Sequence, residues 1–313
     1  MTDDPGNGAQ DGKVPAEPLP LPETGAPADR PPLGIVCAVL GMFSIAMMDG
    51  LAKHLVETYP VGQVTFARHL LAFLPLSLLI WHEGGFKALK TRRPGLHILR
   101  GLALTGGSAS FFLALRYLGL AEATVLAFAA PLFITAFSMP LLGESTGPHR
   151  WSAVVIGFIG VLIVVRPGAG AMTMAAFLPL FAALCYALGM IATRRLSRTD
   201  GLAAIAIFGN LTTIVASSTL LAFGWKTPAL ADLWAFAVMG LLGGSITFFL
   251  TLAYRLAPAA VVAPFDYTAL IWATIIGWLV WREVPDRFVW LGAAVIIASG
   301  LYILYRETRG SRR

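Results

Sequence analysis

The sequence predicts an all-α, polytopic membrane protein with ten transmembrane helices, arranged as two inverted five-helix repeats. Two features of composition and one of pattern support this prediction: 57% of the 313 residues are hydrophobic, only 13% are charged, and two stretches of the chain are near copies of each other. An ordinary soluble domain has about 25% charged residues. With about half that share, the chain lacks the charged side chains that cover a surface facing water.

Ten apolar tracts are candidate spans, because about 20 apolar residues cross the ~30 Å hydrocarbon core of a bilayer. They lie at residues 33–56, 62–81, 97–116, 121–142, 151–166, 174–193, 202–224, 231–254, 259–281 and 287–305. The tract at 151–166 is short, but Arg150 and Arg166 flank it and can extend toward the two interfaces. An even number of spans places both termini on one side of the membrane.

The basic residues of the connectors predict the orientation. With the N-terminus inside, sixteen Lys and Arg residues fall in inside segments and six in outside segments. Because Lys and Arg are enriched in cytoplasmic loops, both termini are expected in the cytoplasm. Residues 1–32, rich in proline and acidic side chains, are expected to form a disordered cytoplasmic tail, and residues 306–313 a basic cytoplasmic tail.

Nucleic acid, metals and cofactors are not expected as partners. The net charge of +6 is spread over short connectors and does not form the continuous basic face of a nucleic-acid-binding protein. Cys37 and Cys185 lie in apolar runs and lack the spacing of a zinc site. Membrane lipids and a small-molecule substrate are the expected partners, and the sequence leaves a homodimer and proton coupling open.

An internal repeat divides the membrane region into residues 33–166 and 174–305. GGSASFFLAL at 106–115 and GGSITFFLTL at 243–252 are identical at seven of ten positions. Each copy holds an odd number of spans, so the second copy enters the membrane from the opposite side. Inverted repeats are typical of alternating-access transporters, whose substrate site lies near the midplane between the repeats.

Several motifs give the chain a family resemblance. The second span contains YPVGQVTFARHLLAFLP, and the fourth and ninth spans end in PLLGE and WLVWRE. With the two five-helix halves, this pattern resembles the EamA group of the drug/metabolite transporter superfamily over about residues 33–305. The resemblance implies a ten-helix carrier of the bacterial inner membrane with a central cavity, and substrates that range over amino acids, nucleotides, vitamins and drugs. AMMDGLAKHLVETYPVGQ and APFDYTALIWATIIGWLVW are also similar to bacterial members that carry S-adenosylmethionine or riboflavin.

Ionisable side chains inside spans are candidates for function, because each costs about 2.5–3.5 kcal/mol at the centre of a helix on insertion scales. Asp49 and Arg68 lie at similar depths in the first hairpin, so we expect them to be able to pair. Lys53 lies four residues after Asp49 and can compete for the carboxylate. The pair is interpreted either as a structural salt bridge or as a cavity-lining or gating element.

Asp266 lies two residues after Pro264, which lacks a backbone donor and bends a helix. A carboxylate at a bend, beside Tyr267, is expected to bind a cationic or hydrogen-bonding group of a substrate. The alternative is an Asp266 that is protonated or hydrogen-bonded for packing alone. Pro131 is the comparable break in the fourth span.

Tyr186 and Asn210 are weaker candidates for the cavity wall, because both residue types also form hydrogen bonds between helices.

We interpret the protein as a secondary transporter of a small organic metabolite. A receptor or scaffold that does not transport is the alternative. A multi-pass enzyme is disfavoured, because the chain has no H-E-x-x-H, G-x-S-x-G or P-loop motif.

Overall fold

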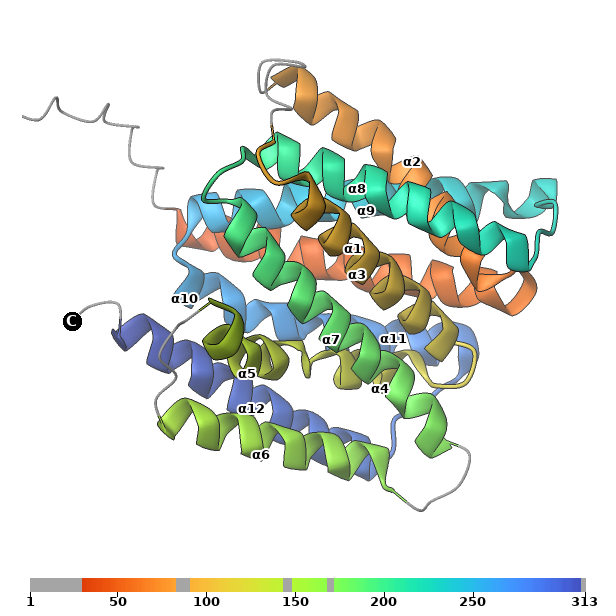
Figure 1. Cartoon of the computed structure of the whole chain (residues 1–313). Helices are drawn as coiled ribbons and strands as arrows, with labels where there is room; N and C mark the ends of the chain where they lie inside the picture. The colour runs from red at the N-terminus through yellow and green to blue at the C-terminus, as the bar shows by residue number, and fades with distance from the viewer. Residues whose placement is uncertain (1–29, 83–90, 143–147, 168–171, 311–313) are drawn as a thin grey trace, which may run out of the picture.

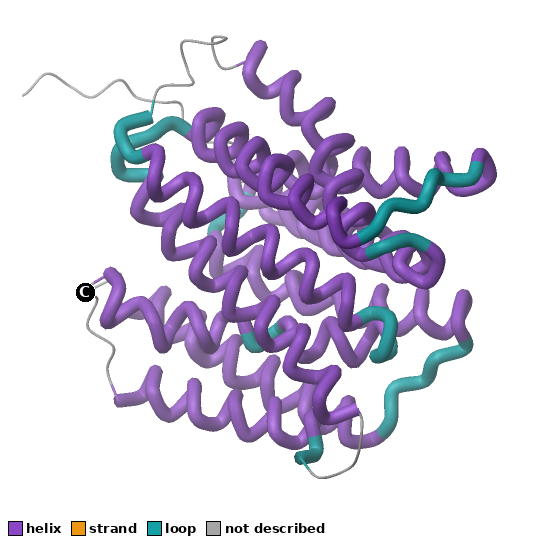
Figure 2. The backbone as a smooth tube through the Cα atoms, turned by 45° about the vertical axis from the view of Figure 1, so that its right-hand side comes forward, coloured by secondary structure: helices purple, strands orange, loops and turns teal. Residues whose placement is uncertain are grey.

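The computed structural model describes residues 30–82, 91–142, 148–167 and 172–310, and all regular structure in these ranges is helical (Figures 1 and 2). The predicted disordered tail therefore lies almost entirely outside the described residues. The main helices are α1 (Pro31–Thr58), α2 (Val61–His82), α3 (Pro94–Ala114), α4 (Leu120–Ala127), α5 (Ala130–Leu142), α6 (Pro148–Val165), α7 (Met172–Leu196), α8 (Leu202–Thr219), α9 (Leu233–Leu256), α10 (Ala259–Val262), α11 (Thr268–Trp281) and α12 (Arg287–Gly310).

Helical segments occupy every range predicted as a span. Proline stands in the first turn of α1 and of α3, where its missing N–H would be unpaired in any case. In the described ranges, eight helical segments are long and apolar enough to cross a membrane; α2 and α3, which carry Arg68 and Arg100, are not among them. The structure is thus that of a polytopic helical membrane protein, and the number of ten crossings stays a prediction.

The fourth and ninth predicted spans are each broken near a proline. The fourth consists of α4 and α5, separated at Phe128 and Ala129, just before Pro131. The ninth consists of α10, the 3-10 helix η4 (Ala263–Tyr267), which contains Pro264, and α11. Each break places irregular backbone inside the bundle, where membrane proteins allow it only against protein or a cavity.

Helices of the first repeat pack mainly on helices of the second. α1 packs along α9, α3 along α7, α6 along α12, and α2 against both α8 and α9. Figure 1 shows α6 and α12 side by side at one side of the bundle. The close approach of α9 to α2 requires glycine, because a Cβ at Gly240 or Gly244 would overlap the side chains of Leu71 and Pro75.

The bundle has two distinct ends. The start of α1 and the end of α12 lie at the same end of the bundle, which we call the terminal end (Figure 1). The corner between α3 and α4 and the connections from α1 to α2 and from α11 to α12 lie at the other end, which we call the corner end. Large side chains are fully buried there: Leu55, Tyr59 and Leu120 are no more than 1% exposed.

The predicted orientation can be tested by cysteine labelling of whole cells in a background without native cysteines. A cysteine at Lys226 or Arg287 should react with a membrane-impermeant maleimide added from outside. A cysteine at Arg93 or Arg195 should stay protected until the cells are permeabilised. Labelling of position 93 in intact cells, together with protection of position 287, would reverse the orientation.

Candidate substrate cavity

A cavity of about 530 Å³ lies in the middle of the bundle, bordered by α1, α3, α4, α5, α7, η4, α11, α12 and one side chain of α2. Its size falls within the range of small-molecule sites. Most of its wall is apolar, including the rings of Phe111, Phe112 and Phe128. Both helix breaks contribute to it, because Pro131 and η4 line its wall.

Asp49 and Arg68 both line this cavity, but they form no ion pair in the described structure. A direct salt bridge between them, which the sequence allowed as one of two interpretations, is therefore not seen between the described side chains. The Nε of Arg68 lies 3.2 Å from the Sδ of Met48, and its Nη1 donates to the Oγ of Ser108 over 3.0 Å. These contacts hold the guanidinium between α1 and α3, and the charges of Asp49 and Arg68 interact through space.

Lys53 does not compete for Asp49, contrary to the expectation from helical spacing. Its Nζ forms an ion pair with Glu283, and it donates a hydrogen bond of 2.9 Å to the carbonyl of Leu118. Glu283, which follows α11, also accepts from the backbone N–H of Leu120 over 3.0 Å. One acid and one base from different repeats thus hold the backbone of the α3–α4 corner.

Arg116 fastens the same corner to α1. Its Nε donates to the carbonyl of Val56 over 2.5 Å, and its Nη2 donates to the carbonyl of Tyr59 over 2.8 Å. We call the group of Lys53, Arg116 and Glu283, with the backbone groups that they bind, the corner clamp. Together with the buried side chains around it, the clamp closes the cavity at the corner end.

A second, smaller cavity of about 290 Å³ lies on the other side of this closure. Along α4, the smaller cavity borders Ala121 and Glu122, and the central cavity begins at Thr124. Along α11, the smaller cavity borders residues 273–277, and the central cavity borders Ala269. The two cavities therefore follow one another between α4 and α11. The central cavity continues toward the terminal end, where Ile303 lines it.

Asp266 also lines the central cavity, at η4. One carboxylate oxygen, Oδ2, lies 3.3 Å from the hydroxyl of Tyr254, whereas Oδ1 is buried and has no hydrogen-bond partner among the described groups. Tyr186 lines the same cavity with half of its surface exposed. Tyr267 packs edge-to-face on Phe128, with ring centroids 5.1 Å apart.

Asn210 lies outside the lining of the central cavity, unlike the other candidate residues with polar side chains. Its Nδ2 donates to the backbone carbonyl of His69 over 3.1 Å, and its Oδ1 lies 3.3 Å from the ring Nδ1 of the same residue. The ring Nε2 of His69 is 3.5 Å from the Nη1 of Arg68. Asn210 therefore supports the segment of α2 that carries Arg68.

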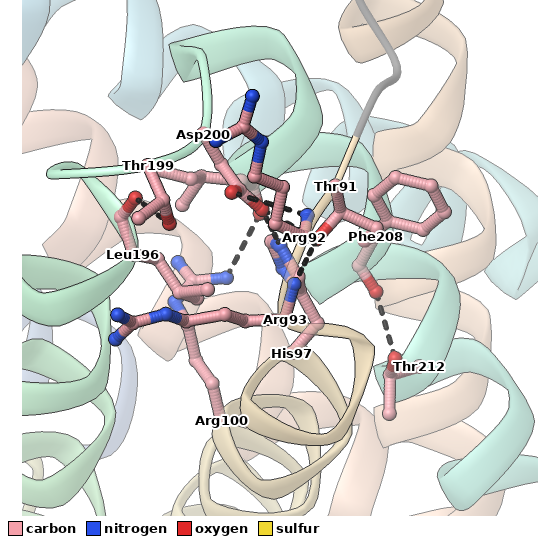
Figure 3. A network of polar contacts seen from close by, with 11 residues as sticks. Thr91, Arg92, Arg93, His97, Arg100, Leu196, Thr199, Asp200, Phe208 and Thr212 are labelled. Carbon is pink, nitrogen blue, oxygen red and sulfur yellow. Dashed lines mark hydrogen bonds and ion pairs between the residues drawn. The ribbon is translucent and has the colours of Figure 1, made fainter.

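A polar network that the sequence did not indicate lies at the terminal end, shown in Figure 3. Asp200, between α7 and α8, accepts from the hydroxyl of Thr91 over 2.5 Å and lies 2.8 Å from the ring of His97. The Thr91 hydroxyl, with His97, holds the pKa of Asp200 well below its usual range despite burial. The network ties the start of α3 to the second repeat.

Arg100 extends this tie along α3. It donates to the Oγ1 of Thr193 over 2.6 Å and to the carbonyl of Ile205 over 3.1 Å. In the sequence analysis, Arg100 is one of the sixteen basic residues of the inside segments, and it has no other predicted role. Its position three residues after His97, on the same face of a helix, is the signal that could have indicated this role.

A helical membrane bundle whose repeats pack on one another around a charged central cavity defines a membrane transporter of small metabolites. The sequence profile of the EamA-like transporter family matches residues 32–166 and again residues 173–305. The chain belongs to this family, and with it to the EamA group of the drug/metabolite transporter superfamily.

Two curated relatives extend over nearly the whole chain. A riboflavin transporter of Rhizobium johnstonii is 31% identical over 287 residues, which are 91% of this chain and 95% of that protein. An S-adenosylmethionine uptake transporter of Rickettsia felis is 29% identical over 280 residues, 90% of this chain and 95% of its own. These relatives are transporters and not enzymes.

A solved crystal structure shares the fold. It has a TM-score of 0.61 to this chain at 20% identity, over 88% of this chain and 97% of its own.

Neutralising the two charges of the cavity separates a structural from a functional role. Asp49→Asn or Arg68→Gln should each lower the monodisperse yield, because the remaining buried charge loses the opposite charge that stabilises it through space. The double variant should recover the yield, while its initial uptake rate stays at least about tenfold below that of the unaltered protein. Near-normal uptake by the double variant, at matched protein amounts, would reduce both residues to structural roles.

Proposed function

We propose that the protein is a secondary transporter of the bacterial inner membrane, with both termini in the cytoplasm, and that it moves a small organic metabolite by alternating access. The observation that carries this proposal is a central cavity with charged groups in its wall, closed at the corner end by the clamp and continuing toward the terminal end. In the predicted orientation this arrangement is an inward-facing state.

The packing supports two mobile bodies, each built from helices of both repeats. α1 packs with α9 and α11 in one body, and α3 packs with α7, which also contacts α4 and α5, in the other. The central cavity lies between these bodies. A rotation of one against the other would open the corner clamp, because Lys53 and Glu283 belong to the first body and the α3–α4 corner to the second.

The clamp is suited to reversible opening. It consists of a few polar contacts to backbone groups, and the only ion pair in it, Lys53 with Glu283, lies within one body and stays intact when the bodies separate. Leu118 and Leu120 flank Gly119, which lines the smaller cavity, so water in that cavity could replace the partners that their backbone groups lose. The names of the two curated relatives make riboflavin and S-adenosylmethionine the first substrates to try.

A crosslink across the clamp tests alternating access. Thr58 and Tyr117 are exposed, lie on opposite sides of the clamp and take no part in it. Cysteines at both positions, joined by a short thiol crosslinker in a background without native cysteines, should abolish uptake into proteoliposomes. Binding of ligand to the purified, crosslinked protein should remain within about threefold of normal. The two single-cysteine variants, treated in the same way, are the controls.

Undiminished uptake by the crosslinked protein would overturn the alternating-access proposal. Loss of uptake in both single-cysteine controls would instead show that the reagent itself blocks the protein, so the comparison is made at equal labelling.

A further inference from the structure

We propose that the central cavity takes a zwitterionic substrate, with an α-amino-carboxylate head group at Asp49 and Arg68 and a planar group that bears N–H donors at Asp266. This inference rests on the proposed transport function, because it assigns the substrate class of the same cavity. Two observations carry it: an acid and a base that line one cavity without contacting each other, and a buried carboxylate oxygen without a donor.

The head-group position consists of two opposite charges with unused hydrogen-bonding capacity. Asp49 is 9% exposed and makes no hydrogen bond within the described ranges. Arg68 uses Nε and Nη1 for Met48 and Ser108, whereas its Nη2 has no partner in the same ranges. A charge away from water is strongly stabilised by an opposite charge that also forms a hydrogen bond.

An α-amino-carboxylate meets both needs at once, because its ammonium group can donate to Asp49 while its carboxylate accepts from Arg68. A ligand without charge would leave Asp49 and Arg68 with only their attraction to each other through space. A ligand with an ammonium group alone would neutralise Asp49 and leave Arg68 without an anion. The two protein charges thus select for a ligand that carries both signs close together.

The tail position is defined by Asp266 and the rings around it. The unpartnered Oδ1 requires a donor, because buried polar atoms are almost always hydrogen-bonded. Tyr186 and Tyr267 line the cavity with this carboxylate, and Phe128 packs on Tyr267. Aromatic walls favour a flat ring in the tail, and the free oxygen favours an N–H on its edge.

Contacts on two sides hold the ring of Tyr267 in place as part of the cavity wall. The hydroxyl of Tyr267 lies against the backbone of Gly300 on α12, where a Cβ would overlap it. The ring is therefore held between Phe128 and α12. The cavity volume of about 530 Å³ also exceeds what a short amino acid fills, which leaves room for a ring-bearing tail.

The first test compares ligands on the unaltered, full-length protein by isothermal titration calorimetry. S-adenosylhomocysteine carries an amino-acid head and an adenine ring, whereas 5′-methylthioadenosine keeps the ring and the thioether but lacks the head. We expect S-adenosylhomocysteine to bind at least tenfold more tightly than 5′-methylthioadenosine, and tryptophan at least tenfold more tightly than tryptamine. The proposal would be overturned if the two zwitterions bound no more tightly than their counterparts without the head group, or if neither zwitterion bound.

The second test assigns the head group to its residues. Asp49→Asn should weaken S-adenosylhomocysteine at least tenfold and leave 5′-methylthioadenosine within about twofold, whereas Asp266→Asn should weaken both ligands. The matched control is Glu57→Gln, which neutralises an exposed carboxylate outside the cavity. Equal weakening of both ligands by Asp49→Asn would show a general structural effect and contradict the assignment. The ligand comparison needs no variant, so it stands even where a variant fails to fold.

Uptake by the same proteoliposomes separates this inference from the proposed function. Riboflavin has no amino-acid head. Transport of riboflavin without binding of the zwitterions would overturn the substrate class and leave the transport function standing. Tight binding of the zwitterions with no uptake of any probe would overturn the transport function and leave the binding site standing.

Discussion

The backbone of the corner between α3 and α4 needs hydrogen-bond partners, and the side chains that supply them also close the central cavity. A chain that turns between two helices leaves backbone N–H and carbonyl groups without helical partners, and each of them needs a hydrogen bond from a side chain or from water. Lys53 pairs with the carbonyl of Leu118, and Glu283 pairs with the N–H of Leu120. Because the two side chains also neutralise each other, charge is brought to this depth without an isolated ion.

The same constraint accounts for the position of the cavity. Where the corner is clamped, α1, α3 and α4 come together in a dense apolar core that includes Leu55 and Leu115. Farther along, the breaks at Pro131 and in η4 turn the backbone away from this packing and leave space between the bodies. Asp49, Arg68 and Asp266 lie around that space, so their unmet hydrogen bonds are available to a ligand.

The helical segments and the two breaks near prolines could be predicted from the sequence. The length of an apolar tract and the position of a proline determine the structure of that segment alone. The sequence could not predict which way a side chain points around its helix. Asp49 and Arg68, which were predicted at similar depths, both line one cavity. The guanidinium contacts Met48 and Ser108 and not Asp49, which the depths alone did not predict. Asn210 and His97 have roles that depend on helix pairs distant in the chain, which no spacing reveals.

We infer that the corner clamp opens during transport while the contacts within each body persist. Double electron–electron resonance between spin labels at Tyr117 and Val284, on opposite sides of the clamp, measures this directly. We expect one short distance in the ligand-free protein and a second, longer distance when transported substrate is added. A single unchanged distance in protein that still transports would show that the clamp does not open.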